Sequence, residues 1–203
     1  MLEEARRLGI LGPGPVEAHL RHAAGFASAI DTAMTADGGS GSRGADLGSG
    51  AGLPGLPLAL RYSGWRWTLV DSAARRAAFL REAVRVLGVD GRVEVAEERA
   101  EMLGRVPEHR GRYDLVVARS FGPPAVVAEC AAPLLVCGGL VVVSEPPRGD
   151  PARWPADGLA LLGMTPVLSV LAEAGAYQLL RQEHPCADRY PRRVGVPTKR
   201  PLF

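Results

Sequence analysis

The sequence lacks the features that mark membrane, secreted and metal-binding proteins. It contains no run of 18 apolar residues, and the opening stretch Met1–Arg7 shows no apolar signal-peptide core. We therefore expect a cytoplasmic protein with no membrane partner. The cysteines Cys130, Cys137 and Cys186 have no Cys-x-x-Cys spacing, so the sequence predicts neither a disulfide framework nor a zinc site.

The sequence also has little net charge and almost no lysine. The net charge of +2 does not by itself indicate a nucleic-acid-binding protein, and lysine is almost absent, since Lys199 is the single lysine among 24 basic residues. Residues 181–203 nevertheless hold six basic and two acidic residues, so this end is positive and the rest of the chain is slightly negative. Such an end permits contact with phosphate groups without requiring it.

What the sequence does contain is a glycine-rich stretch, Asp46–Gly55, placed between a short apolar-acidic segment and a segment with a helical pattern, 54–60. Glycine lets the backbone turn sharply from a strand and lets a ligand lie against it. A second expected strand, 65–71, ends in Asp71, which would accept hydrogen bonds from ribose hydroxyls. Together these features predict a nucleotide-type site.

The glycine spacing indicates which nucleotide. A dinucleotide fingerprint needs a glycine at the sixth position from Gly48, where this chain has Leu53. An acid, Asp46, stands two residues before the first glycine and suits a ligand with an ammonium group, so S-adenosylmethionine is favoured over NAD. An NAD-dependent enzyme and a tight strand-to-helix turn without a ligand stay open as alternatives.

The remaining patterns predict an α/β fold, a doubly wound and mostly parallel sheet with an antiparallel last strand. We divide the chain into a helical arm and linker (1–40), a cofactor-binding domain (41–182) and a basic tail (183–203). The carboxyl ends of the strands would bring together Gly48, Asp71 and Arg119. The expected helices are 3–8, 15–33, 73–88, a short one from near Glu97, and 123–135; the expected strands are 65–71, 92–96, 113–118, 139–144 and a hairpin of 167–171 with 176–181; the expected linker is 35–44.

The helix at 15–33 carries two histidines on one side. Its expected apolar face consists of residues at a helical period: Val16, Leu20, Ala23 or Ala24, Ala27 and Ile30. For His19 and His22 we favour solvated or hydrogen-bonded side chains over a metal pair, since no third ligand is near.

These motifs resemble those of the 16S ribosomal RNA guanine-N7 methyltransferases, also called the glucose-inhibited division protein B family. The loop Asp46–Leu58 is similar to the family's glycine motif, and its Leu-Pro-Gly-Leu-Pro half is the specific part. Leu69–Ser72, Arg99–Glu101 and Ala118–Phe121 are similar to its motifs after the next three strands, and 189–202 to a C-terminal signature.

The resemblance implies a class I methyltransferase (Rossmann-like) fold and transfer of a methyl group from S-adenosylmethionine to guanine N7 of 16S ribosomal RNA. It implies a monomer without a metal, acting on the RNA or the small ribosomal subunit, with Arg119 as the catalytic residue at the methyl-transfer face. The expected cofactor-binding residues are Asp46, Gly48, Gly50, Gly52, Leu53, Asp71, Ala100, Glu101 and Arg119; the expected RNA contacts are Arg189, Arg192, Arg193, Lys199 and Arg200.

Two departures from the family pattern bear on the substrate. About 40 residues precede the loop where the family has a larger helical region, and Glu145 stands where the family typically has a lysine. Both leave the cofactor motifs intact. Two further alternatives therefore stay open: the same fold with a small-molecule or protein acceptor, and a non-catalytic paralogue that binds the cofactor or RNA.

Overall fold

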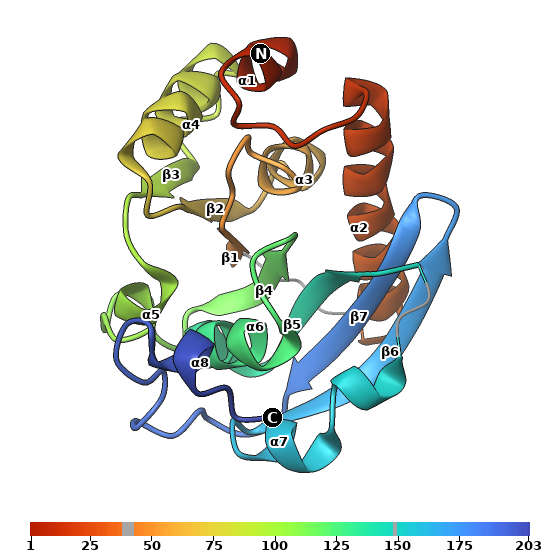
Figure 1. The fold of residues 1–203 in the computed structure, drawn as a ribbon, viewed down its shortest axis with the longest axis vertical. Coiled ribbons are helices and arrows are strands. Elements are labelled where there is room, and N and C mark those ends of the chain that lie inside the picture. The colour runs from red at the N-terminus through yellow and green to blue at the C-terminus, as the bar shows by residue number, and fades with distance from the viewer. Residues whose placement is uncertain (38–42, 148–149) are drawn as a thin grey trace.

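The computed structural model describes residues 1–37, 43–147 and 150–203 (Figure 1). In chain order its elements are α1 (Leu2–Arg7), α2 (Val16–Asp37), β1 (Arg43–Leu47), α3 (Gly55–Arg61), β2 (Arg66–Val70), α4 (Ala74–Val86), β3 (Val93–Ala96), α5 (Ala100–Leu103), β4 (Tyr113–Ala118), α6 (Pro124–Ala131), the 3-10 helix η1 (Ala132–Leu134), β5 (Leu135–Glu145), the 3-10 helix η2 (Pro151–Arg153), α7 (Ala156–Ala160), β6 (Met164–Ala172), β7 (Gly175–Gln182) and α8 (Val196–Lys199). None of the helices in these ranges combines the length and the apolar character needed to cross a bilayer.

The strands form one sheet in the order β3-β2-β1-β4-β5-β7-β6. The five strands β3, β2, β1, β4 and β5 are parallel, and β7 lies antiparallel between β5 and β6. The hairpin of β6 and β7 closes where Ala172 pairs with Gly175, at the predicted place. The predicted doubly wound sheet with its antiparallel end is thus confirmed.

Helices cover both faces of this sheet, which is why its central strands are apolar throughout. On one face, α2, α3 and α4 pack on a core that includes Trp67, Leu115 and Leu179. On the other, α5, α6 and α7 pack on a core that includes Val116, Val141 and Leu180. Figure 1 shows α2 running alongside β7 at one end of the sheet.

Helix α2 buries most of the predicted face, since Val16, Ala23 and Ile30 are buried. Leu20 is the exception, because it is 43% exposed. Phe26, which was not predicted, is buried instead and makes an edge-on contact with Tyr177, with ring centroids 4.9 Å apart. Only tertiary contacts decide which residues at the border of a helical face are buried.

The predicted linker 35–44 is wrong at both ends, because α2 continues to Asp37 and β1 already begins at Arg43. The part between, 38–42, lies outside the described residues. The division of the chain into arm, domain and tail stays a prediction.

The C-terminal segment folds back onto the sheet, and Figure 1 shows α8 beside α6. Tyr190 and Pro197 are buried. The Arg110 guanidinium donates hydrogen bonds to the carbonyl oxygens of Cys186 (2.8 Å) and Tyr190 (2.8 Å). This segment therefore belongs to the packed structure.

Candidate functional site

The glycine loop after β1 is held by two carboxylates. Gly50 N donates to Asp71 Oδ2 (3.0 Å), and Gly55 N donates to Asp46 Oδ2 (2.9 Å). A Cβ at Gly55 would lie 2.6 Å from that same Asp46 oxygen, so only glycine fits there. The loop backbone is thus fixed from both sides by the two acids that the sequence singles out.

Gly48 begins the loop in the left-handed region, with φ +69°. A Cβ at this position would lie 2.9 Å from Cδ2 of Phe121 and would be strained by the backbone as well. The bare backbone at Gly48 therefore lets the Phe121 ring, from the segment that follows β4, pack directly against the loop.

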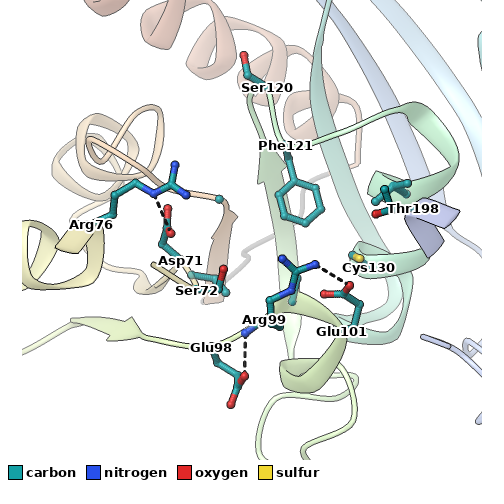
Figure 2. Close-up of a pocket in the computed structure, with 14 residues that line it drawn as sticks. Asp71, Ser72, Arg76, Glu98, Arg99, Glu101, Ser120, Phe121, Cys130 and Thr198 are labelled. Atoms are coloured by element: carbon teal, nitrogen blue, oxygen red, sulfur yellow. Dashed lines mark hydrogen bonds and ion pairs between the residues drawn. The ribbon is translucent and has the colours of Figure 1, made fainter. Parts of the chain in front are cut away.

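Asp71, at the carboxyl end of β2, is fixed in its rotamer by several donors. Its Oδ1 accepts from Ala73 N (2.9 Å) and from Arg76 Nε (3.1 Å), and its Oδ2 accepts from Gly50 N. A carboxylate oxygen offers about two lone-pair sites, so Oδ2 keeps capacity for one more donor. Figure 2 shows the Asp71–Arg76 pair at one side of the cavity.

A cavity of about 280 Å³ opens at the carboxyl ends of β1, β2, β3 and β4 (Figure 2). Its lining draws on all of these strand ends and on the C-terminal segment, and includes Gly48, Asp71, Ala100, Glu101, Phe121 and Thr198. This is the edge at which ligands bind in open α/β sheets.

Glu101 ties the cavity to the C-terminal segment. Its Oε1 accepts from Arg99 Nη2 (3.0 Å) and from Gly195 N (3.1 Å). Burial alone would raise the pKa of Glu101, but hydrogen bonds from Arg99 and from backbone amides outweigh it and lower the pKa. The side chain is therefore ionised and fixed.

Most of the predicted cofactor residues lie at this cavity or directly under it. Gly48, Asp71, Ala100 and Glu101 line it. Gly50 and Gly52 shape the loop, and Leu53 is buried beneath it.

Asp46 is also buried beneath the loop, with 1% of its surface exposed. Its Oδ1 has no hydrogen-bond partner, and burial raises its pKa to about 7. The carboxylate is therefore short of positive charge.

A second cavity, of about 350 Å³, adjoins the first. Ser120 and Phe121 line both cavities and so form the wall between them. Ser120 has φ +53°, the left-handed conformation that non-glycine residues rarely adopt.

Arg119 lines the second cavity and not the first. Its guanidinium is half-buried, and burial lowers its pKa. It forms a 2.6 Å hydrogen bond with Nδ1 of His19 from α2. In the described ranges, no cluster of three or more His, Cys, Asp and Glu side chains is arranged to hold a metal ion.

The basic residues of the C-terminal segment have different surroundings. Arg192 pairs with the fully buried Glu129 (2.6 Å), and the Arg189 guanidinium lies 5.1 Å from the ring centre of Tyr190. The remaining three are exposed: Arg193, Lys199 and Arg200.

Several residues at the two cavities are absent from the predicted set. Arg99 and Phe121 lie within segments that resemble family motifs, so the motifs could have pointed to them. Arg76 lies five residues after Asp71, in the first turn of α4, and this position is a usable signal. Thr198 lies within the segment that resembles the C-terminal signature. His19 reaches Arg119 only through tertiary folding, and no local pattern could have found it.

Comparisons with known proteins bear on this site. A family described as "GidB: rRNA small subunit methyltransferase G" matches residues 19–145. Three proteins named "Ribosomal RNA small subunit methyltransferase G" are similar, and each alignment covers 78% of this chain. The protein of Deinococcus deserti is 39% identical and is covered over 67% of its own length. The protein of Deinococcus radiodurans is 41% identical and covered over 65%, and that of Rubrobacter xylanophilus is 39% identical and covered over 64%. The chain thus spans about two thirds of the length of these relatives.

Solved structures share the fold at low sequence identity. The [4+2]-cyclase SpnF has a TM-score of 0.58 at 16% identity, covering 77% of this chain and 80% of its own. "PigF with SAH" has a TM-score of 0.56 at 18% identity, covering 78% and 56%. Together with the strand order, these likenesses confirm the predicted Rossmann-like fold of class I methyltransferases.

Proposed function

Because the chain belongs to the GidB family, described as rRNA small subunit methyltransferase G, we propose that it transfers a methyl group from S-adenosylmethionine to guanine N7 of 16S ribosomal RNA. The observation that carries this proposal is the pair of adjoining cavities, one under the glycine loop and one beside Arg119, with a single wall of Ser120 and Phe121 between them.

The first cavity fits the cofactor. Gly48 and Phe121 line it side by side, and Asp71 Oδ2 can accept a ribose hydroxyl in addition to Gly50 N. The backbone at Ala100 and the side chain of Glu101 would lie beside the adenine. The ammonium group of the methionine end would supply the positive charge that the buried Asp46 lacks.

The second cavity would hold the acceptor base. Guanine N7 carries an in-plane lone pair, so it can attack the methyl carbon as the carbon–sulfur bond breaks, and no general base is required. Catalysis would then rest on orientation: the Ser120–Phe121 wall sets the approach of the base, and Arg119 donates to guanine O6 or to a phosphate. The base would have to leave its stack or lie in a single-stranded loop.

Two features support an RNA acceptor. Arg193, Lys199 and Arg200 are exposed and available for phosphate groups, as is Arg189, whereas Arg192 is engaged by Glu129. Glu145 forms an ion pair with Arg153 (3.1 Å), so the acid at the family's lysine position is balanced by a cation. With a ribosomal acceptor, the protein would act in the cytoplasm as a monomer.

The proposal is tested with the purified protein, radiolabelled S-adenosylmethionine, and three acceptors: small ribosomal subunits, naked 16S RNA and a metabolite extract. Mass spectrometry of 16S RNA from cells with and without the protein identifies the nucleotide. We expect label in RNA as 7-methylguanosine. Label in the extract alone would indicate a small-molecule acceptor, and S-adenosylhomocysteine binding without any transfer would indicate a non-catalytic paralogue.

A further inference from the structure

The side chain that holds Arg119 comes from a helix 100 residues earlier in the chain. His19 lies on α2, and its Nδ1 is 2.6 Å from Nη2 of Arg119. Its other ring nitrogen, Nε2, is 3.2 Å from the carbonyl oxygen of Gly12. The imidazole is 9% exposed, so both contacts are largely shielded from water.

These two contacts determine the tautomer of the ring. A guanidinium has only N–H donors and a carbonyl oxygen only accepts. Nδ1 must therefore offer its lone pair to Arg119, and Nε2 must carry the proton donated to Gly12. A doubly protonated imidazole would place an N–H against the N–H of Arg119 and add a second positive charge at the same place.

We propose that His19 is a positioning residue for methyl transfer, a neutral imidazole that accepts from Arg119 and orients its guanidinium in the acceptor cavity. This inference rests on the proposed function, because it assumes that Arg119 contacts the acceptor. It adds that the segment before α2 takes part in catalysis indirectly, since Gly12 fixes the ring.

The surroundings of Arg119 leave this role to His19. In the described part of the chain Arg119 forms no ion pair, and His19 is its one recorded hydrogen-bond partner. Three other groups act on it at longer range: Asp46 from β1, Tyr177 from β7 and His22 from α2. An arginine side chain has several rotatable bonds, so without the His19 imidazole the Arg119 guanidinium would sample many positions.

His22 does not duplicate the acceptor, because its Nδ1 has no hydrogen-bond partner among the residues that the structure describes. Burial and the nearby Arg119 and His19 lower its pKa to about 4, so His22 stays neutral in the neutral pH range.

Three substitutions of His19 separate positioning from packing. Asparagine places its carbonyl oxygen near the position of Nδ1, so His19→Asn keeps the acceptor, whereas His19→Gln places its amide near Nε2, and His19→Leu keeps neither. We expect His19→Leu and His19→Gln to lose about tenfold to a hundredfold in kcat, with S-adenosylhomocysteine affinity unchanged. His19→Asn should recover most of the rate, a rescue that a merely structural role of the ring would not produce. The exposed His184, changed to Asn, is the matched control and should behave as wild type.

A second measurement does not depend on activity. Nitrogen NMR of the wild-type imidazole should show Nδ1 unprotonated and Nε2 protonated, and the Arg119 guanidinium signals should broaden or shift in His19→Leu and not in His184→Asn. Full activity of His19→Leu, or a ring protonated at Nδ1, would overturn the inference. If wild type binds the cofactor but methylates no RNA, the proposed function fails, while the NMR result still decides whether His19 holds Arg119.

Discussion

The ion pair between Arg192 and Glu129 is the strongest link between the C-terminal segment and the body of the protein. The Glu129 side chain on α6 is fully buried and accepts from the backbone N (2.8 Å), Nε (2.8 Å) and Nη2 (2.6 Å) of Arg192. Substituting Arg192→Ala keeps the backbone donor and removes every bond from the guanidinium. A buried carboxylate would then lack its counter-charge.

Removing one partner of a buried pair typically costs about 3–5 kcal/mol of the free energy of unfolding. The Arg192 side chain is 26% exposed, so water can partly solvate the Glu129 carboxylate once the guanidinium is removed. We therefore expect a loss at the lower end of this range, about 3 kcal/mol. With a urea m-value of about 2 kcal/mol per molar, the unfolding midpoint would fall by about 1.5 M.

The assay is equilibrium urea unfolding followed by circular dichroism. Arg193→Ala is the matched control, because this neighbour is exposed and should change the free energy of unfolding by less than about 0.5 kcal/mol. The double variant with Glu129→Gln should recover part of the loss, since the uncompensated charge is gone. If Arg192→Ala and Arg193→Ala unfold at the same urea concentration, the pair does not anchor the segment and Arg192 is free for RNA.

Three further predictions concern the site. Arg119→Ala should abolish methyl transfer to RNA while its circular dichroism spectrum and its S-adenosylhomocysteine affinity stay at wild-type values; equal methylation by both proteins would contradict the proposed role. Asp71→Ala should weaken S-adenosylhomocysteine binding in calorimetry by about tenfold to a hundredfold, since it removes a charged hydrogen bond to the ligand and one that shapes the loop. Asp46 has its pKa raised to about 7 by burial, against about 4 when unfolded, so the folded state binds its proton more tightly. Its contribution is present below about pH 4 and is lost as the pH rises through about 7, and the free energy of unfolding of wild type relative to Asp46→Asn should fall over that range. A difference that does not change with pH would refute this.

The sequence was sufficient for those features of the site that depend on local patterns. The glycine loop requires positive φ at Gly48 and the absence of a side chain at Gly55, and glycine is the residue type that meets both requirements. The apolar strands and the acid that ends β2 predicted the sheet and the position of Asp71. The family matches confirm the resemblance that these motifs suggested, and with it the methyltransferase class.

Contacts between distant segments could not be predicted in the same way. Glu145 illustrates the reason, because its sequence position indicated a reversed charge near the substrate. The structure places Arg153, from the unpredicted helix η2, beside it, so the local charge is balanced. A single-sequence pattern records each charge and not its partner.

The wall between the two cavities is also shaped by contacts between distant segments. Nothing in the dipeptide Ser120-Phe121 predicts a left-handed serine, yet Ser120 is the one non-glycine residue with positive φ in the part of the chain that the structure describes. Such a conformation costs about 1–3 kcal/mol and persists only where the surroundings enforce it. The residues on either side of Ser120 fix its conformation, since Phe121 packs against the bare Gly48 and Arg119 is held by His19. The turn thus directs Arg119 toward the second cavity and Phe121 toward the glycine loop. Under the proposed function, the strain falls at the point where the methyl group would pass from one cavity to the other.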